Sequence, residues 1–124
     1  MKKKILVVDD EASLTRLIKA NLERTGKYEV MTENHSVNAL ACAKQFKPDL
    51  IFLDVMMPDL GGDEIAALIE EDPHLSGIPC VFLTAIVRKV ETEPTGSMIG
   101  GRLFLAKPVK TEQLIATIER VIGR

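Results

Sequence analysis

Four short apolar runs in this sequence each lead directly into polar side chains that could do chemistry. The runs cover residues 5–8, 50–53, 80–83 and 103–106, and the polar residues that follow them are Asp9 with Asp10, Asp54, Thr84 and Lys107. Unbroken apolar runs of this length are typical of parallel strands that are buried on both faces. Because the carboxyl ends of parallel strands lie along one edge of a sheet, we expect these five side chains to lie close together.

Three carboxylates in one place repel one another, so the pattern predicts a cation beside them. Two like charges about 4 Å apart cost about 4 kcal/mol at an effective dielectric of about 20. Oxygen ligands at the wet edge of a sheet suit Mg²⁺, or Mn²⁺ in its place, whereas no Cys or His is placed to hold a softer metal. The adjacent pair Asp9 and Asp10 is suited to holding this metal.

Asp54 is the best candidate nucleophile of the set, because it alone ends the central strand. With a metal and Lys107 neutralising the charge, its carboxylate can attack a phosphoryl group and form an aspartyl phosphate. Thr84 could then donate a hydrogen bond to one phosphoryl oxygen, and Lys107 could pair with another.

Each of these residues also has a purely structural interpretation. Taken alone, Asp9 or Asp10 more often caps the helix that follows, and only the convergence with Asp54 favours a metal site. Thr84 and Lys107 alone would be ordinary residues at strand ends. The following nearby residues are interpreted as packing, turn or solvated positions: Met56, Met57, Pro58, Gly61, Gly62 and the acidic run 70–72.

The segments between the apolar runs predict helices and one edge strand. Residues 28–33 alternate apolar and polar side chains, as in a half-exposed strand at the edge of a sheet. Apolar residues at helical spacing predict helices over residues 14–22, 37–41, 65–69 and 114–122, with a C-terminal cap at Gly26, an N-terminal cap at Ser36, a stop before Pro73 and a start at Thr111. The predicted fold is α/β, with five βα units in a doubly wound parallel sheet.

Residues 88–101, where the fourth helix belongs, depart from this scheme. Pro94 removes a backbone donor, and Gly96, Gly100 and Gly101 each lower helix stability. We therefore expect a short or displaced fourth helix, labile or specific to a partner.

The bulk properties narrow the class of protein. A chain of 124 residues matches one domain, residues 1–124, with no room for an output domain. A net charge of -2 and the absence of Trp give no reason to expect direct binding to nucleic acid or to a membrane. No apolar run reaches the length of a signal peptide or a membrane span, so we expect a cytoplasmic protein.

The two cysteines, Cys42 and Cys80, lie in apolar stretches and are interpreted as buried free thiols of a reducing compartment. A zinc site made with His35 and His74 is the alternative, but no pair among these residues has ligand spacing.

The whole chain resembles a response-regulator receiver domain, the phosphoacceptor module of two-component signalling. The resemblance rests on five motifs in the family's order: residues 5–11 (ILVVDDE), residues 53–58 (LDVMMP), Gly61 with Gly62, residues 83–85 (LTA) and residues 104–108 (FLAKP). It implies a flavodoxin-like sheet with the strand order 2-1-3-4-5.

The resemblance also implies roles for individual residues. Asp54 would be the phosphoacceptor, and Mg²⁺ would be bound by the side chains of Asp9, Asp10 and Asp54 and by the backbone carbonyl of Met56. Thr84 and Lys107 would contact the phosphoryl group, with a cis peptide between Lys107 and Pro108. Thr84 would move toward the phosphoryl group and the switch aromatic, Phe104, would turn inward.

The implied function is a phosphorylation-dependent switch that changes the face formed by the fourth helix, fifth strand and fifth helix. It would not be an enzyme beyond its own phosphoryl transfer and slow autodephosphorylation. Its partners would be a sensor histidine kinase or phosphotransfer protein and a downstream target protein or output domain, with a phosphorylation-dependent homodimer also allowed. The alternatives are a receiver-fold module that is never phosphorylated, an aspartate-based phosphatase and a flavodoxin-like nucleotide binder.

Two positions next to the site predict a long-lived phosphoryl group. The family often uses the side chains two residues after the phosphoacceptor and two after the switch hydroxyl to position the hydrolytic water. Here these residues are Met56 and Ile86, and neither can hold water by a hydrogen bond.

Overall fold

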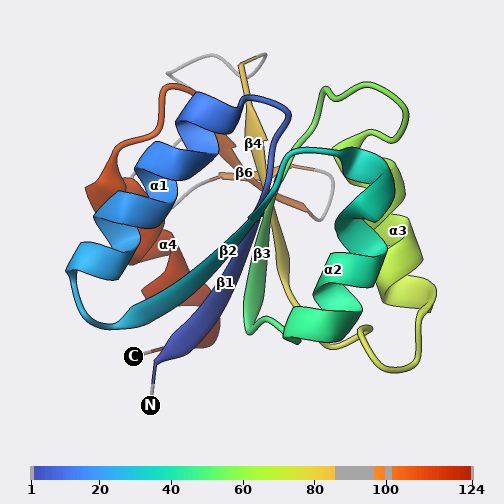
Figure 1. The fold of residues 1–124 in the computed structure, drawn as a ribbon, viewed down its shortest axis with the longest axis horizontal. Coiled ribbons are helices and arrows are strands. Elements are labelled where there is room, and N and C mark those ends of the chain that lie inside the picture. Colours follow the sequence, from blue (N-terminus) through green and yellow to red (C-terminus); the bar gives the residue numbers. More distant parts are fainter. Residues whose placement is uncertain (1, 86–96, 100–101, 124) are drawn as a thin grey trace.

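A sheet forms the middle of the molecule, and helices cover both of its faces (Figure 1). The computed structural model describes residues 2–85, 97–99 and 102–123. Within these residues the strands are β1 Lys3–Val8, β2 Tyr28–Glu33, β3 Leu50–Asp54, β4 Cys80–Thr84, β5 Ser97–Ile99 and β6 Arg102–Ala106. Their order across the sheet is β2-β1-β3-β4-β6-β5. All neighbours are parallel except β5 and β6, so the order 2-1-3-4-5 predicted for the parallel strands is confirmed.

Strand β5 is not predicted by the periodicity of the sequence. It consists of three residues, Ser97–Ile99, paired antiparallel with β6. Three residues are too few to show the alternation of apolar and polar side chains that identifies a strand. The glycines beside them indicate only a weak helix. Residues 97–99 of the stretch in which a short or displaced fourth helix is expected are therefore not helical, and the remainder of residues 88–101 lies outside the described residues.

Two pairs of helices sandwich the sheet. The helices are α1 Ala12–Arg24, α2 Ala39–Phe46, α3 Gly62–Glu71 and α4 Thr111–Ile122. Helices α1 and α4 cover one face, and α2 and α3 cover the other (Figure 1). Alternate residues of β1 face opposite layers, since Ile5 packs with α1 and α4 whereas Leu6 packs with α2 and α3. Both faces of the sheet are shielded from water by helices, which explains the unbroken apolar runs. Burial of each such side chain contributes roughly 1.5–3 kcal/mol to the stability of the fold.

Most of the predicted helix ends are confirmed. Helix α1 is followed by Gly26 with a φ of 77°, a left-handed conformation that favours glycine after a helix. Helix α3 ends at Glu71, two residues before Pro73, and α4 begins at Thr111.

The predicted capping role of Ser36 is wrong. Residues Ser36–Asn38 form a turn of 3-10 helix, η1, and the residue that precedes α2 is Asn38, which makes no side-chain capping bond. The Ser36 hydroxyl instead contacts the backbone of the distant loop after β3. A serine before a helical pattern predicts a cap only when no tertiary partner competes for its hydroxyl.

Strand β2 lies at an edge of the sheet, as its alternating pattern predicts, and α1 partly covers that edge. Lys19 donates to the outward carbonyl of Val30 at 2.6 Å, and Glu23 accepts the N–H of the same residue at 3.0 Å. Lys19 and Glu23 also pair with each other at 3.0 Å. Side chains thus satisfy backbone groups that would otherwise invite another strand.

The cysteines are free thiols, as predicted, but they are half-buried rather than fully buried. Burial raises the pKa of Cys80 to about 12, so this thiol stays protonated at neutral pH. Within the described residues, the group of side chains that could hold a metal contains neither cysteine nor histidine. No helix in this part of the chain is long and apolar enough to cross a bilayer.

Gly62, the first residue of α3, lets the helix approach the end of β3. A Cβ atom at this position would overlap the backbone carbonyl of Asp54. The Gly62 N–H also donates to the carbonyl of Val55 at 3.1 Å, which holds the helix start against the strand. The close approach therefore requires glycine.

Gly62→Ala is expected to lower the free energy of unfolding by about 1–3 kcal/mol, because the added methyl must displace backbone. Urea denaturation would measure the change. Gly77→Ala is the matched control, since a Cβ there meets no heavy atom within 4 Å. Equal losses in the two variants would contradict the close-approach argument.

Candidate functional site

The carboxyl ends of β1 and β3 bring three aspartates together, as the sequence predicts. Asp9, Asp10 and Asp54 each place one carboxylate oxygen within 4.8 Å of the others. The parallel register explains the meeting, because Val8 lies opposite Leu53 and the next residues are the acids. Asp9 is fully buried and Asp54 is 6% exposed, whereas Asp10 is exposed. One side of the cluster is therefore buried, and the other side is open to solvent.

Lys107 lies among these acids. Its ammonium nitrogen is 2.7 Å from Oδ2 of Asp9, 3.4 Å from Oδ2 of Asp54 and 3.9 Å from Oε1 of the exposed Glu11. Lys107 follows β6, and its backbone N–H donates to the carbonyl of Thr84 at 2.8 Å, which extends the pairing with β4 by one residue. The peptide between Lys107 and Pro108 is cis. The lysine side chain is only 16% exposed, so its charge is directed at the carboxylates.

Asp9 does not cap helix α1. Its Oδ1 accepts the N–H of Glu11 at 3.0 Å, but Glu11 itself precedes the helix and makes no side-chain capping bond. The contact shapes the loop between β1 and α1 and leaves Oδ2 facing Lys107. Asp9 is therefore not the helix cap that its structural interpretation predicts.

The electrostatics of the cluster are dominated by burial and by the number of acids. Burial and, after it, the charge of Asp9 raise the pKa of Asp54, Lys107 and the N–H of Met56 oppose them, and the net result is a pKa of about 6. Burial lowers the pKa of Lys107, but its hydrogen bond to Asp9 and the charges of both acids outweigh that effect and the net shift is upward. Lys107 thus stays an ammonium at neutral pH, where Asp54 is mostly ionised.

The other predicted site residues surround this cluster at different distances. Thr84 ends β4, next to β3, and is 2% exposed. Met56 is 67% exposed, and its N–H points toward Oδ1 of Asp54 at 3.4 Å. Phe104 is half-buried and stacks on Phe82, with 5.1 Å between ring centroids. Ile86 lies outside the described residues.

Three residues near the cluster are given no role in the site by the sequence predictions. Glu11 approaches Lys107, Asn34 donates to the backbone carbonyl of Asp9, and Ser36 binds the loop after β3. The sequence could have predicted that Asn34 lies near the cluster, because it is the polar residue that follows the edge strand β2 at the same end of the sheet. The other two show no local pattern.

The donor set suits a hard divalent cation. All the clustered atoms are carboxylate oxygens, and one face of the group is open to solvent through Asp10. Mg²⁺ prefers oxygen ligands and retains several waters, which needs such an open side. The residues present therefore fit the cation that the sequence predicts.

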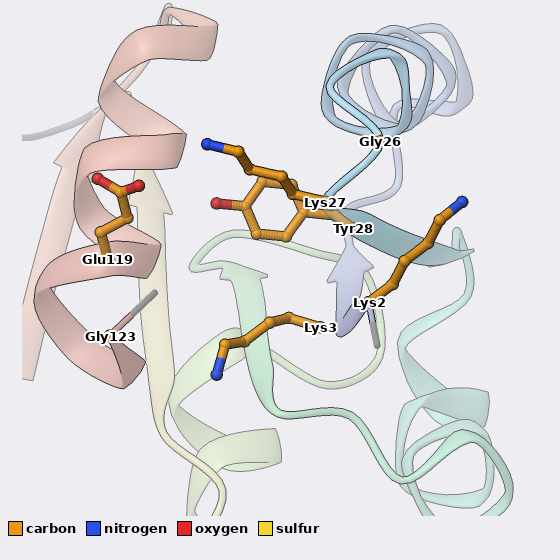
Figure 2. Close-up of a pocket in the computed structure, with 7 residues that line it drawn as sticks. All are labelled: Lys2, Lys3, Gly26, Lys27, Tyr28, Glu119 and Gly123. Carbon is orange, nitrogen blue, oxygen red and sulfur yellow. The ribbon is translucent and has the colours of Figure 1, made fainter.

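The largest hollow described in the structure lies elsewhere. It measures about 500 Å³ and lies at the amino ends of β1 and β2, opposite the acid cluster, where Figure 2 shows Tyr28 and Lys27 reaching toward Glu119 of α4. No residue of the acid cluster lines it. Within the described residues, the candidate site lies at the opposite edge of the sheet, where Asp10 is exposed to solvent.

Asp54→Asn is expected to stabilise the protein at about pH 7.5 and to have little effect at about pH 4. A raised pKa means that the folded protein takes up a proton between about pH 4 and pH 6, so the stability contributed by this group falls as the pH rises through that window. Removing the charge should add about 1–2 kcal/mol above it. Urea denaturation across the pH range would measure the difference.

Asp59→Asn is the control for that titration, because Asp59 is exposed in the loop after β3. A difference between Asp54→Asn and wild type that does not depend on pH would contradict the raised pKa.

Comparison with known proteins identifies the family. The response regulator receiver domain model matches residues 5–119. The alkaline phosphatase synthesis transcriptional regulatory protein PhoP of Bacillus subtilis is 37% identical over 124 residues, which are 100% of this chain and 50% of that protein. Protein PilH of Pseudomonas aeruginosa is 33% identical, and the match covers 97% of this chain and 98% of PilH.

A solved structure agrees with these matches. The chemotaxis response regulator CheY4 of Vibrio cholerae superposes with a TM-score of 0.81 at 30% identity, covering 98% of this chain and 100% of that one. The chain spans about half the length of the first curated relatives that it matches, and nearly all of PilH. On the family match over residues 5–119 and the shared fold, the chain belongs to the response regulator receiver domain family of two-component signalling.

Proposed function

We propose that this receiver domain is a signalling switch that accepts a phosphoryl group on Asp54 with the help of Mg²⁺. The observation that carries the proposal is the position of Asp54: it is nearly buried, lies 3.4 Å from the ammonium of Lys107 and has two more carboxylates beside it. Burying a carboxylate in such a place lowers the stability of the protein, and a structural role would not offset this cost. A reaction at Asp54 accounts for it.

The proposed metal ligands are the side chains of Asp9, Asp10 and Asp54 and the backbone carbonyl of Met56. Three aspartates and one lysine leave a net charge of about -2 when all are ionised, which a divalent cation balances. Bound Mg²⁺ would neutralise charge on the phosphoryl oxygens and help to orient them. Mn²⁺ has the same preference for oxygen and would substitute.

The chemical step needs the side chains of Asp54, Lys107 and Thr84 together with the cation and an external phosphoryl donor. An ionised oxygen of Asp54 attacks the phosphorus, a P–O bond forms, and the bond between phosphorus and the donor breaks, with its electron pair leaving on the donor. Lys107 pairs with a phosphoryl oxygen and the hydroxyl of Thr84 donates to another. The donor would be the phosphohistidine of a sensor histidine kinase or phosphotransfer protein, and we place the exchange in the cytoplasm, where ATP supplies such donors.

The output of the switch would be a changed surface around β6 and α4. Phosphorylation adds a charge of about -1.5 to -2 that must be met by donors. If Thr84 moves toward the phosphoryl group, the space it leaves is available to the half-buried Phe104, which stacks on Phe82. The face read by a partner would then change shape. That partner would be a downstream protein, an output domain or a second phosphorylated copy.

Incubation with acetyl phosphate and Mg²⁺ is expected to add the mass of one phosphoryl group to the wild type, and chelation of Mg²⁺ should prevent it. Asp54→Asn should abolish the mass change, because the amide is no nucleophile. Intact-protein mass spectrometry reads the result directly.

Asp59→Asn provides the matched control and should be phosphorylated like the wild type. Metal-dependent phosphorylation that persists in Asp54→Asn would contradict the assignment of the phosphoacceptor. A wild type that binds Mg²⁺ but takes up no phosphoryl group would favour the alternative of a receiver that works without phosphorylation.

The phosphoryl group on Asp54 is expected to be long-lived, because the exposed side chain of Met56 cannot hold the hydrolytic water. Met56→Asn should accelerate loss of the phosphoryl group by about tenfold or more, since an amide can hydrogen-bond that water. The decay of the phosphorylated mass after removal of acetyl phosphate gives the rate. Met56→Leu, which keeps an apolar side chain, should decay like the wild type, and equal decay in the two variants would sink the idea.

A further inference from the structure

The segment that follows β2 reaches both loops that carry the candidate metal ligands. The loop between β1 and α1 carries Asp9 and Asp10, and the loop between β3 and α3 carries the carbonyl of Met56. The connection from β2 to α2 runs along the same end of the sheet as these loops (Figure 1). Two of its side chains, Asn34 and Ser36, each bind one loop.

Asn34 fixes the loop between β1 and α1. Its side-chain amide donates to the carbonyl of Asp9 at 2.8 Å and to the hydroxyl of Thr15 at 2.9 Å. The fully buried Thr15 donates in turn to the carbonyl of Ala12 in the first turn of α1. The carbonyl of Glu33 accepts the N–H of Asp9 at 3.1 Å. Consecutive residues of one segment thus hold both backbone groups of Asp9.

Ser36 fixes the loop between β3 and α3. Its hydroxyl donates to the carbonyl of Pro58 at 2.6 Å and accepts the N–H of Leu60 at 3.1 Å. Ser36 is 4% exposed, so both bonds are shielded from water and their loss would leave buried groups unpaired. The bond from Gly62 to Val55 closes the same loop at its ends. The backbone around Met56 is therefore held from two sides.

Fixing these loops limits how far the three carboxylates can move apart when no cation is bound. Without a cation the three carboxylates repel, and free loops would relax by moving them apart. Drawing them together again would then subtract from the free energy of metal binding. Asn34 and Ser36 are neutral, so they restrain the backbone without adding a positive charge that competes with the cation.

We propose that Asn34 and Ser36 are positioning residues that preorganise the Mg²⁺ site, each through its own loop. This inference rests on the proposed function, since it assigns these residues to the same metal. Neither side chain touches a carboxylate oxygen in the bonds described, and both act through the backbone that carries the ligands.

Mg²⁺ titration followed by backbone amide NMR shifts of Glu11 and Met56 tests the proposal. Fluorescence is a poor probe, because the chain has no Trp and its one Tyr lies at the opposite end of the sheet. Asn34→Ala and Ser36→Ala should each raise the Mg²⁺ dissociation constant by about tenfold, as loss of residues that orient metal ligands does. The exposed matched controls Asn38→Ala and Ser76→Ala should stay within about twofold of the wild type.

A residue that serves only the fold would lower the melting temperature and leave the Mg²⁺ affinity of the folded variant unchanged. An affinity within about twofold of wild type therefore overturns the role of whichever residue was replaced. If Asn34→Ala does not fold, Thr15→Val removes the hydroxyl that accepts from Asn34 and donates to the carbonyl of Ala12, and it should weaken Mg²⁺ binding by about fivefold. An unchanged affinity in that variant overturns the role of Asn34 equally.

Amide hydrogen exchange of the metal-free protein separates this inference from the proposed function. Asn34→Ala should speed exchange at Glu11 and not at Leu60, and Ser36→Ala should do the reverse. If the wild type binds no Mg²⁺, the proposed function fails on that titration, whatever the exchange pattern. If Mg²⁺ binds and the exchange rates of both loops are unmoved by the substitutions, the preorganisation inference fails while the proposed function stands.

Discussion

The ion pair between Lys107 and the two buried carboxylates is the interaction on which the acid cluster depends. Asp9 is fully buried and Asp54 almost so, and each would cost several kcal/mol if it were left without a partner. One ammonium at 2.7 Å and 3.4 Å offsets that cost only in part, as the pKa of about 6 for Asp54 indicates. The site therefore keeps an excess of negative charge, which the proposed divalent cation would balance.

The ion pair depends on the register in which the parallel strands are paired. Asp54 lies opposite Leu83 and Thr84 lies opposite Ala106, so each of three neighbouring strands carries its polar residue one position beyond that of the strand before, along the same edge of the sheet. A slip of one residue in any pairing would turn a buried apolar row toward the wrong layer. The apolar runs thus fix the register, and the register fixes the distance between acids and lysine.

The same reasoning explains what can be predicted from the sequence and what cannot. The parallel strands, the helix ends at Gly26 and Pro73 and the meeting of Asp9, Asp54 and Lys107 follow from local periodicity combined with one topological rule. Strand β5 and the bonds of Ser36 do not follow, because a three-residue pairing and a hydroxyl bonded 22 residues away leave no local pattern. Ser36 even resembled a helix cap, since the same hydroxyl chemistry suits both roles.

The exposed position of the acid cluster affects how a phosphoryl donor would be recognised. The hollow of about 500 Å³ lies at the other end of the sheet, and the carboxylate of Asp10 beside Asp54 is open to solvent. Discrimination must come from the surface around the site, where Asp10, Glu11 and Met56 are exposed. These residues belong to the two loops that Asn34 and Ser36 restrain. If the proposed roles hold, restraint from the segment after β2 would act on metal binding and on the surface presented to the donor at once, because the same backbone serves both.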